Sequence, residues 1–159
     1  DYRLWVQQGF ITATEGDVVD TDYLSKDIER IFHLYRVKNL TYDPWMATNG
    51  VIQHLEKVGY YNILDPIAQT ITYLSEPTKD LQKRLQRREL DLMNNPVLRW
   101  MFRNVAIYTD PNMNIRLNKA KSTEKIDGCA ASVNAIAGYI SKTANTREAY
   151  AGGREIKVI

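Results

Sequence analysis

The first half of the chain alternates between helical and strand-like periodicity, and this order limits the folds available to it. Apolar residues have helical spacing over residues 20–35 and again over residues 47–60. A short β-prone segment follows each of them, at residues 38–43 and 61–65. Strands separated by a helix pair in parallel through a crossover. The sequence therefore predicts an α/β fold with a sheet covered by helices.

Further segments complete the expected arrangement. They are two short strands around a turn at Glu15–Gly16 within residues 9–20, a helix over residues 77–90, a hairpin turning at Asp110–Pro111–Asn112 within residues 105–117, and an Ala- and Gly-rich helix over residues 122–141. Asp20 or Thr21 is the expected N-cap of the first helix. Residues 1–141 form the expected domain, and residues 142–159 a polar tail with a short apolar end.

Composition excludes several classes of protein. The net charge of +2 is too small to indicate nucleic-acid binding by itself, so a basic surface must come from local clustering. The single cysteine, Cys129, excludes an internal disulfide and a Cys-rich zinc site, and it reads as a small buried hydrophobe. His33 and His54 stand alone in helical patterns, where packing or surface roles are expected. No apolar run is long enough for a membrane span. The sequence contains no phosphate-binding loop of the G-x-x-x-x-G-K-[ST] type, so ATP hydrolysis is not expected.

Asp43 is the first candidate for a catalytic residue that binds metal. It ends the strand expected over residues 38–43, and Pro44 then removes a backbone donor and disfavours helix before it. Ligands of open α/β sheets collect at the carboxyl ends of the strands, which is where Asp43 falls. A turn or a helix cap explains the same residue equally well, because Asp-Pro is a common turn signal.

Asp127 is the second candidate, near the start of the last helix, where the helix dipole favours an acid. Gly128 leaves room for a close approach beside it, and Glu124 is expected at the solvated surface. The basic stretch before it supplies three cations that can contact DNA phosphates: Lys119, Lys121 and Lys125. Carboxylates at a sheet edge suit Mg²⁺ or Mn²⁺, and two such ions can hold both reacting oxygens of a phosphodiester.

The helix over residues 77–90 carries a basic stripe. Lys79, Lys83 and Arg87 are spaced four apart and share one face, which Arg84 and Arg88 widen. Most such stripes are solvated faces without a partner. Beside a carboxylate site, this one indicates contact with the DNA backbone.

Five segments occur in an order that is typical of one viral family: "GFITATEGDVVD", "YDPW", "EPTKDLQ", "NPVLRW" and "KAKSTEKIDG". Each is weak alone, but the set at these distances is specific. Over residues 2–141 the chain resembles the C-terminal nuclease domain of the large terminase subunit of tailed bacteriophages.

The resemblance implies an RNase H-like mixed sheet flanked by helices and a two-metal Mg²⁺ or Mn²⁺ endonuclease that cuts concatemeric viral DNA during genome packaging. Three acids bind metal in that family, and Asp43 and Asp127 correspond to two of them. The implied partners are double-stranded viral DNA, the terminase small subunit, the portal and the family's N-terminal ATPase domain. No membrane is implied, and the implied location is the cytoplasm of the host bacterium.

The chain departs from the family in two respects, at its opening strand and before the third helix. The family's first acid lies on an opening strand well before the segment matching residues 5–10, so that acid and strand are expected to be absent. Residues 1–159 alone are therefore expected to cut weakly or not at all. Of the family's Arg-Gln-Gly-like stretch only Gln69 matches. The β-prone segment at residues 154–159 is expected to complete the sheet, within the chain or by exchange with a second copy.

Two other functions are compatible with the residues. In a non-catalytic DNA-binding or docking module, the basic residues would act and the acids would only cap helices and turns. Another RNase H-like nuclease, such as a junction resolvase, would use the same carboxylates, although the order of the motifs argues against it.

Overall fold

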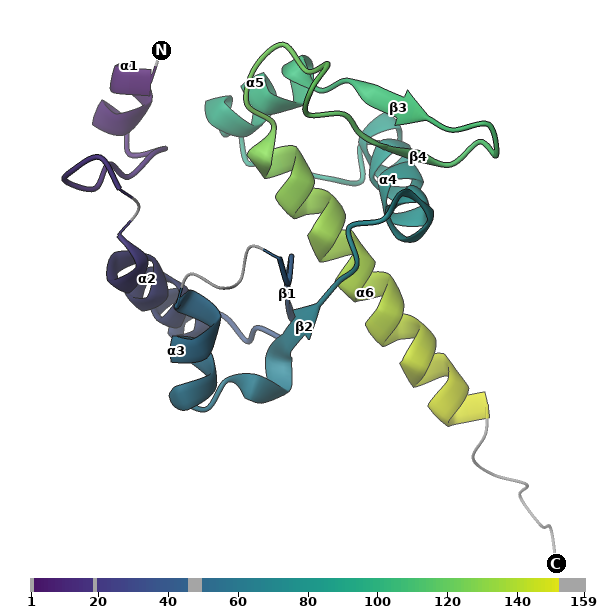
Figure 1. Cartoon of the computed structure of the whole chain (residues 1–159), viewed down its shortest axis with the longest axis horizontal. Helices are drawn as coiled ribbons and strands as arrows, with labels where there is room; N and C mark the ends of the chain where they lie inside the picture. Colours follow the sequence, from purple (N-terminus) through teal and green to yellow (C-terminus); the bar gives the residue numbers. More distant parts are fainter. Residues whose placement is uncertain (1, 19, 46–49, 152–159) are drawn as a thin grey trace, which may run out of the picture.

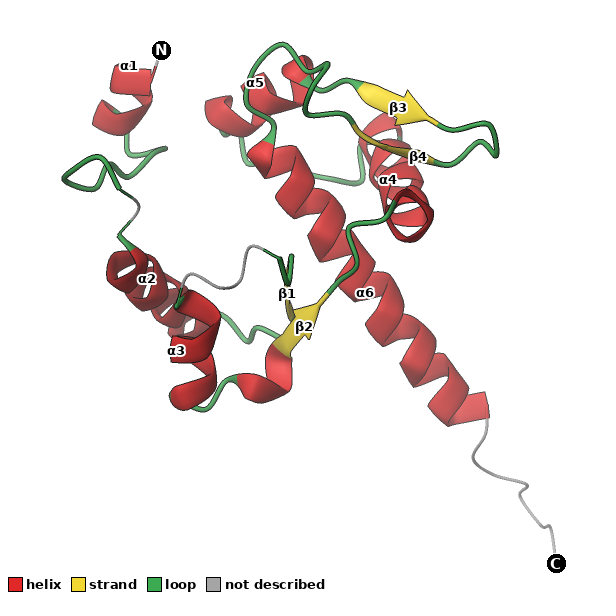
Figure 2. Cartoon of the chain, in the orientation of Figure 1, coloured by secondary structure: helices red, strands yellow, loops and turns green. Residues whose placement is uncertain are grey.

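The computed structural model describes residues 2–18, 20–45 and 50–151, with side chains through residue 143 (Figure 1). Most of the ordered elements are helices, and the strands are short (Figure 2). In chain order they are α1 (Tyr2–Gln7), α2 (Thr21–Leu34), β1 (Leu40–Tyr42), α3 (Val51–Lys57), the 3-10 helix η1 (Tyr61–Ile63), β2 (Leu64–Pro66), α4 (Ile71–Gln86), α5 (Pro96–Asn104), β3 (Ile107–Thr109), β4 (Ile115–Leu117) and α6 (Asp127–Ala151).

β1 and β2 form a parallel pair, joined by a connection that contains α3 and η1. Leu40 lies opposite Leu64, and Tyr42 lies opposite Pro66. The predicted strand–helix–strand crossover is therefore confirmed. The second strand is shorter than predicted, because Tyr61–Ile63 form a 3-10 turn before it begins.

β3 and β4 form the predicted antiparallel hairpin, in which Ile107 lies opposite Leu117. The Asp110 carboxylate accepts hydrogen bonds from the Asn114 backbone N–H at 2.8 Å and from its side-chain amide at 3.0 Å, which closes the predicted turn. In the described part of the chain, this hairpin and the β1–β2 pair are separate sheets. The α/β class is confirmed. The single mixed sheet that was predicted is not seen among the described residues.

The two strands predicted within residues 9–20 are wrong for the residues that the structure describes there. These residues form turns and bends, with Gly9 and Gly16 at positive φ and Val18 81% exposed. A two-stranded hairpin is marginal without a third strand or a helix to pack against. No neighbouring strand satisfies the backbone of this segment in the described residues.

The helices agree with the sequence in place but differ at their ends. Asp20 is the N-cap of α2, accepting from the Tyr23 N–H at 2.9 Å, as predicted. α4 begins at Ile71 and not at Pro77, because Thr70 caps it and the buried Pro77 is accommodated inside it. α5 was not predicted, although Asn95 followed by proline is a start signal. None of the described helices combines the length and apolar character that crossing a membrane requires.

α6 also differs from its prediction at both ends. It starts at Asp127, after a loop, and it continues to Ala151, so the predicted domain boundary at residue 142 falls inside a helix. The segment at residues 154–159 that was expected to complete the sheet lies outside the described residues.

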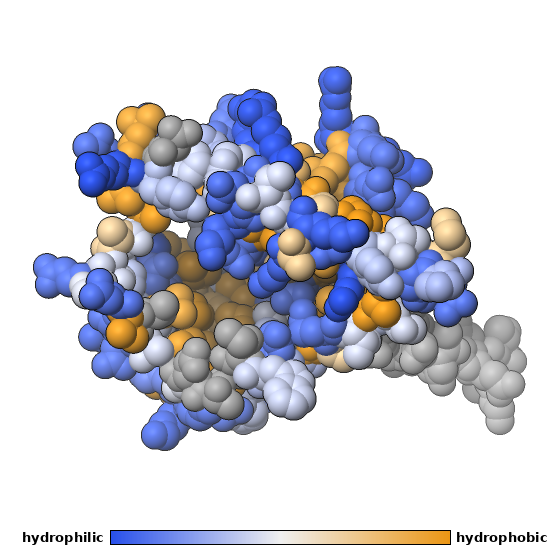
Figure 3. All heavy atoms as spheres, turned by 45° about the horizontal axis from the view of Figure 1, so that its top comes forward, coloured by the Kyte–Doolittle hydropathy of each residue, from blue (hydrophilic) through white to orange (hydrophobic). Residues whose placement is uncertain are grey.

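The buried core surrounds α6, where it packs against α4, α5 and β1. Most of the buried apolar residues belong to this part of the fold: Ile67, Leu81, Val97, Ile126, Cys129, Val133 and Ala137. Several apolar residues of α1 and α2 are instead exposed, among them Leu4, Leu24 and Leu34. Figure 3 shows hydrophobic residues gathered inside a hollow on one face. The N-terminal helices thus bury less of their apolar surface than α4–α6.

Small residues of α6 allow its close packing, as the sequence predicted. A Cβ at Gly138 would collide with the side chains of Thr41, within β1, and of Asn39, just before it. A Cβ at Gly128 would lie 2.5 Å from Leu98 Cδ2 and 2.9 Å from Met101 Sδ of α5. The space beside Gly128 is therefore filled by α5, and the close approach expected there is a helix–helix contact.

The Gly138→Ala variant tests this packing. Alanine favours a helix over glycine by roughly 1 kcal/mol, but overpacking against β1 costs about 1–3 kcal/mol. We expect a lower free energy of unfolding in urea titrations. Ala131→Gly, at an exposed position of the same helix, measures helix propensity alone. A stabilised Gly138→Ala variant would contradict the close approach of α6 to β1.

Candidate active site

Asp43 directly follows β1, and its side chain takes part in a turn. Its Oδ1 accepts a hydrogen bond from the Trp45 backbone N–H at 3.0 Å, across Pro44. Pro44 cannot donate from its own nitrogen, so the chain turns here and the strand ends. The residue is half-buried, and its Oδ2 has no hydrogen bond with the described residues. The turn interpretation of Asp43 is therefore correct, and it leaves one carboxylate oxygen for another ligand.

Asp43 lines a cleft of about 410 Å³ that we call the Asp43 cleft. Gln69 comes to it from the β2–α4 loop, and its Nε2 donates to the Ile67 carbonyl at 3.3 Å. The remaining polar lining comes from α4, from β4 and the loop after it, and from α6: Thr78, Arg116, Asn118, Lys119 and Asn134. The cleft thus combines one carboxylate with two cations and several neutral polar groups.

Asp127 is the first residue of α6 and is exposed. Its Oδ1 lies 3.5 Å from Lys119 Nζ. It lines a second cleft of about 360 Å³, the Asp127 cleft, together with Glu124 and Lys125. Lys119 lines both clefts, so the two candidate acids are placed on neighbouring surfaces that share one lysine.

A tight turn after β4 positions this lysine. The Asn118 carbonyl accepts from the Ser122 N–H at 3.0 Å and from its hydroxyl at 2.7 Å. Ser122 Oγ in turn accepts from the Ala106 N–H at 3.0 Å, and the Thr123 hydroxyl donates to Asn104 Oδ1 at 3.2 Å. These bonds tie the turn to the end of α5 and hold Lys119 between the clefts.

A hard cation fits these residues only in part. Carboxylate oxygens are suitable ligands, and Mg²⁺ commonly takes one or two of them and completes its shell with water and substrate phosphate. Among the described residues, no group of three or more His, Cys, Asp or Glu side chains is arranged to hold a metal. Asp43 and Asp127 can therefore supply at most the two protein carboxylates of such a site.

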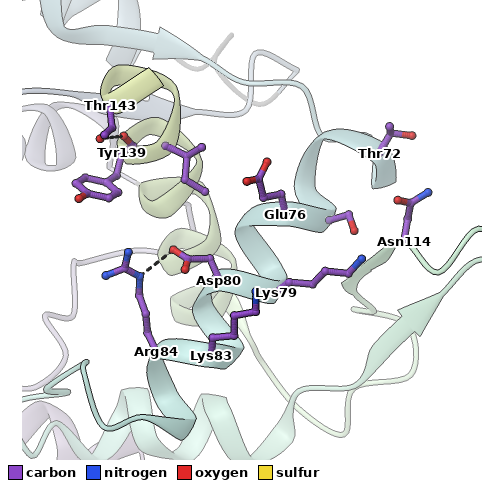
Figure 4. A pocket seen from close by; sticks show the side chains of 11 residues that line it. Thr72, Glu76, Lys79, Asp80, Lys83, Arg84, Asn114, Tyr139 and Thr143 are labelled. Carbon is purple, nitrogen blue, oxygen red and sulfur yellow. Dashed lines mark hydrogen bonds and ion pairs between the residues drawn. The ribbon is translucent and has the colours of Figure 1, made fainter. Parts of the chain in front are cut away.

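The predicted DNA-binding residues fall into two sets. Lys119 and Lys125 line the Asp127 cleft, and Lys121 is exposed in the same loop. Lys79 and Lys83 line a different pocket between α4 and α6, which has a volume of about 770 Å³ and which we call the α4–α6 groove (Figure 4). Most of the positive charge of α4 is thus separated from Asp43 by the body of that helix.

Two arginines of the predicted α4 stripe, Arg87 as one of its three members and Arg84 as a residue expected to widen it, have acidic partners within the chain. Arg84 donates to Asp80 at 2.8 Å and lies over the Tyr139 ring of α6, with Cζ 5.6 Å from the ring centroid (Figure 4). Arg87, at the end of α4, lies 3.8 Å from Glu89. The stripe is therefore narrower than predicted, and Lys79 and Lys83 carry most of it.

The β3–β4 hairpin lies next to this stripe. Hydrogen bonds from Asn114 hold the pKa of Asp110 below its usual value, and the charge of Lys79 adds to this effect. Asn114 lines the α4–α6 groove, whereas Arg116, two residues along β4, lines the Asp43 cleft. The hairpin thus connects the two predicted basic sets.

Arg116 was missed by sequence reasoning. The alternation Ile115–Arg116–Leu117 places it on the outer face of the hairpin, a signal that was available. Cys129 and His54 behave as predicted. Burial raises the pKa of the fully buried Cys129 thiol to about 11, and His54 of α3 lies 2.6 Å from Glu29 of α2.

Comparisons with known proteins identify the family. The family model for the terminase large subunit endonuclease domain matches residues 1–142. Protein YmfN of Escherichia coli (strain K12) is 27% identical over 139 residues, which cover 85% of this chain and 30% of YmfN. The terminase large subunit of Enterobacteria phage HK97 is 24% identical over 144 residues, which cover 89% of this chain and 28% of that protein.

The crystal structure of the HK97 bacteriophage large terminase superposes with a TM-score of 0.78 at 23% identity. The match covers 86% of this chain and 28% of that structure, and it shows that the two share a fold. The chain spans less than a third of the length of these relatives. From the family match over residues 1–142, the chain belongs to the terminase large subunit endonuclease domain family.

Proposed function

We propose that this domain is a metal-dependent DNA endonuclease that cuts concatemeric viral DNA during genome packaging. Membership of the terminase endonuclease family supports nuclease chemistry in general. The observation that carries the residue assignment is the placement of Asp43 and Asp127 on two clefts that share Lys119. The acids come from different elements, 84 positions apart in sequence (127 − 43), as expected for a site assembled by the fold.

Asp43 and Asp127 would hold Mg²⁺ or Mn²⁺ through carboxylate oxygens. When bound, such an ion polarises the phosphate and lowers the pKa of a coordinated water, and two ions can hold both reacting oxygens. Oδ2 of Asp43 remains for this role, because the Trp45 N–H uses Oδ1. Asp127 is exposed, and its one ion pair with the described residues is the contact with Lys119, so it can exchange that partner for a cation.

Lys119 and Lys125 would bind DNA phosphates next to these acids, with Lys121 on the same loop. Lys79 and Lys83 would bind the backbone at a distance from the reacting phosphate, on the α4 face. Arg87, at the end of α4, would join them by exchanging its exposed contact with Glu89 for a phosphate. Lysines act as mobile point charges, and contacts to phosphates position DNA without reading its sequence. The expected substrate is therefore double-stranded DNA without strong base preference.

The same proposal includes the family's finer properties. The parallel β1–β2 pair with its crossover is compatible with an RNase H-like arrangement. The partners would be viral DNA, the terminase small subunit, the portal and an ATPase domain, within the cytoplasm of a host bacterium.

The metal site is tested with asparagine variants. Asp43→Asn keeps Oδ1 as the acceptor for the Trp45 N–H, so we expect the free energy of unfolding to change by less than about 0.5 kcal/mol. Asp43→Asn and Asp127→Asn should each weaken Mn²⁺ binding about tenfold or more. Electron paramagnetic resonance of free Mn²⁺ measures this. Glu15→Gln, which removes an exposed acid from the bend before α2, is the matched control.

Cutting is measured on supercoiled plasmid with Mg²⁺ or Mn²⁺, using residues 1–159 and a version extended upstream of residue 1. We expect weak cutting by residues 1–159, since two carboxylates fix a cation poorly. Metal-dependent cutting that survives Asp43→Asn in the extended version would contradict the assigned site. DNA binding without cutting by the extended version would favour the docking module.

DNA binding is expected to depend on salt through Lys79 and Lys83. Each phosphate contact releases counterions, so replacing both lysines by alanine should flatten the slope of log affinity against log salt by about two units. Fluorescence anisotropy of a labelled duplex measures the slope. The control replaces two exposed lysines of α2 and α3, Lys26 and Lys57, by alanine, which removes the same charge from another surface and should leave the slope unchanged. Equal slopes for the two double variants would show that Lys79 and Lys83 are solvated residues that do not contact DNA.

A further inference from the structure

Arg116 and Tyr108 form a cross-strand pair on the outer face of the β3–β4 hairpin. They lie directly opposite each other in the antiparallel register. The Arg116 Cζ lies 5.7 Å from the centroid of the Tyr108 ring, within the range of a cation–π contact. Both residues are exposed, while Ile115 and Leu117 on either side of Arg116 are half-buried. The hairpin therefore presents this pair to solvent at the edge of the Asp43 cleft.

The contact with the ring leaves the hydrogen-bonding capacity of Arg116 available. A cation–π contact acts through the charge of the guanidinium and uses none of its five N–H donors. Among the described residues, no carboxylate lies within ion-pair distance of Arg116. A planar donor held on a ring without an internal acceptor is suited to bind an oxyanion in a bidentate manner.

The second arginine–tyrosine pair of the fold has a different environment. Arg84 lies at a similar distance from Tyr139, 5.6 Å, but its Nε donates to Asp80 at 2.8 Å. The charge of Arg84 is thus compensated within the helix. Both guanidinium groups are therefore positively charged, but the charge of Arg84 has a carboxylate partner in Asp80, whereas none of the described ion pairs includes Arg116.

We propose that Arg116, held over Tyr108, binds a DNA phosphate at the Asp43 cleft, and that Tyr108 is its positioning residue. The proposal rests on the endonuclease function proposed above. Arg116 lines the same cleft as Asp43 and precedes Lys119 by three residues, a separation of at most about 10 Å along the chain. Arg116 and Lys119 would therefore contact nearby phosphates of one strand at the Asp43 cleft.

The turn of the hairpin supports this role. Asp110 binds both amide groups of Asn114, which holds the β3–β4 register that sets Arg116 opposite Tyr108. The packing of β4 on α4 fixes the hairpin itself, since Ser75 Oγ accepts from the Ile115 N–H at 3.1 Å. Arg116 thus stands on a fixed element between the α4 stripe and the acids.

The test measures DNA binding in EDTA, so that cutting does not enter. Arg116→Ala should reduce the slope of log affinity against log salt by about one unit. Arg116→Lys should keep the slope but weaken binding, because lysine neither stacks in a plane nor binds a phosphate in a bidentate manner. Tyr108→Leu should keep the slope and weaken binding about two- to fivefold, the value of a cation–π contact.

Arg36→Ala is the matched control. Arg36 is an exposed arginine that precedes β1, whereas Asp43 follows the same strand, so it lies at the opposite end. Arg36→Ala should keep the wild-type slope. The circular dichroism and melting temperature of each variant are measured to show that it is folded. Arg116→Lys then shows how much of the effect of Arg116→Ala is due to the loss of positive charge.

The outcomes separate this proposal from the function on which it rests. Wild-type protein without salt-dependent DNA binding would overturn the DNA-cutting function and the Arg116 contact together. Wild-type binding with the same slope for Arg116→Ala and Arg36→Ala would overturn the Arg116 contact alone. Unchanged affinity in Tyr108→Leu would remove the positioning role of the ring.

Discussion

The packing of α6 against β1 and α5 is the contact on which the candidate site depends. Gly138 lets the helix approach Thr41 of β1, and Gly128 lets its first turn approach Leu98 of α5. Asp127 is the first residue of the same helix, and Asp43 is the residue after the same strand. The relative position of the acids is therefore set by a close-packed contact in which neither acid takes part. Charged residues can then be arranged for ligands without holding the fold together.

The cationic surface is divided by the elements that carry it. α4 presents Lys79 and Lys83 to the α4–α6 groove, while its opposite side is buried against α6 and β4. The loop after β4 presents Lys119 to both acid clefts. A net charge of +2 gives little long-range field, so under the proposed function these local groups and Arg116 on the hairpin would determine where DNA binds.

Much of the fold was accessible from local patterns. Apolar spacing predicted α2, α4 and α6, and the β1–β2 crossover followed from the strand–helix–strand order. Their ends were less predictable: Pro77 looks like a first helical residue, but burial against the core allows it inside α4. The prediction of two strands within residues 9–20 was wrong, because strand formation depends on a neighbouring strand to pair with. A local sequence pattern does not show whether such a neighbour is present. Asp43 and Asp127 could be chosen as candidates because they lie at the expected ends of a strand and a helix. That Lys119 lines the clefts of both acids could not be predicted, because it depends on how distant segments pack.

The weakness of the contacts around the two acids is consistent with a site that exchanges partners. The Lys119–Asp127 pair is 69% and 66% exposed, and such surface pairs contribute roughly 0–1 kcal/mol to stability. Asp43 uses one oxygen for the Trp45 N–H, and that acceptor is available from an aspartate or an asparagine alike. Folding therefore does not require the negative charge of Asp43, and it requires little from that of Asp127. Because the fold positions these two carboxylates but depends little on their charge, they suit the cation site that we propose beside Lys119.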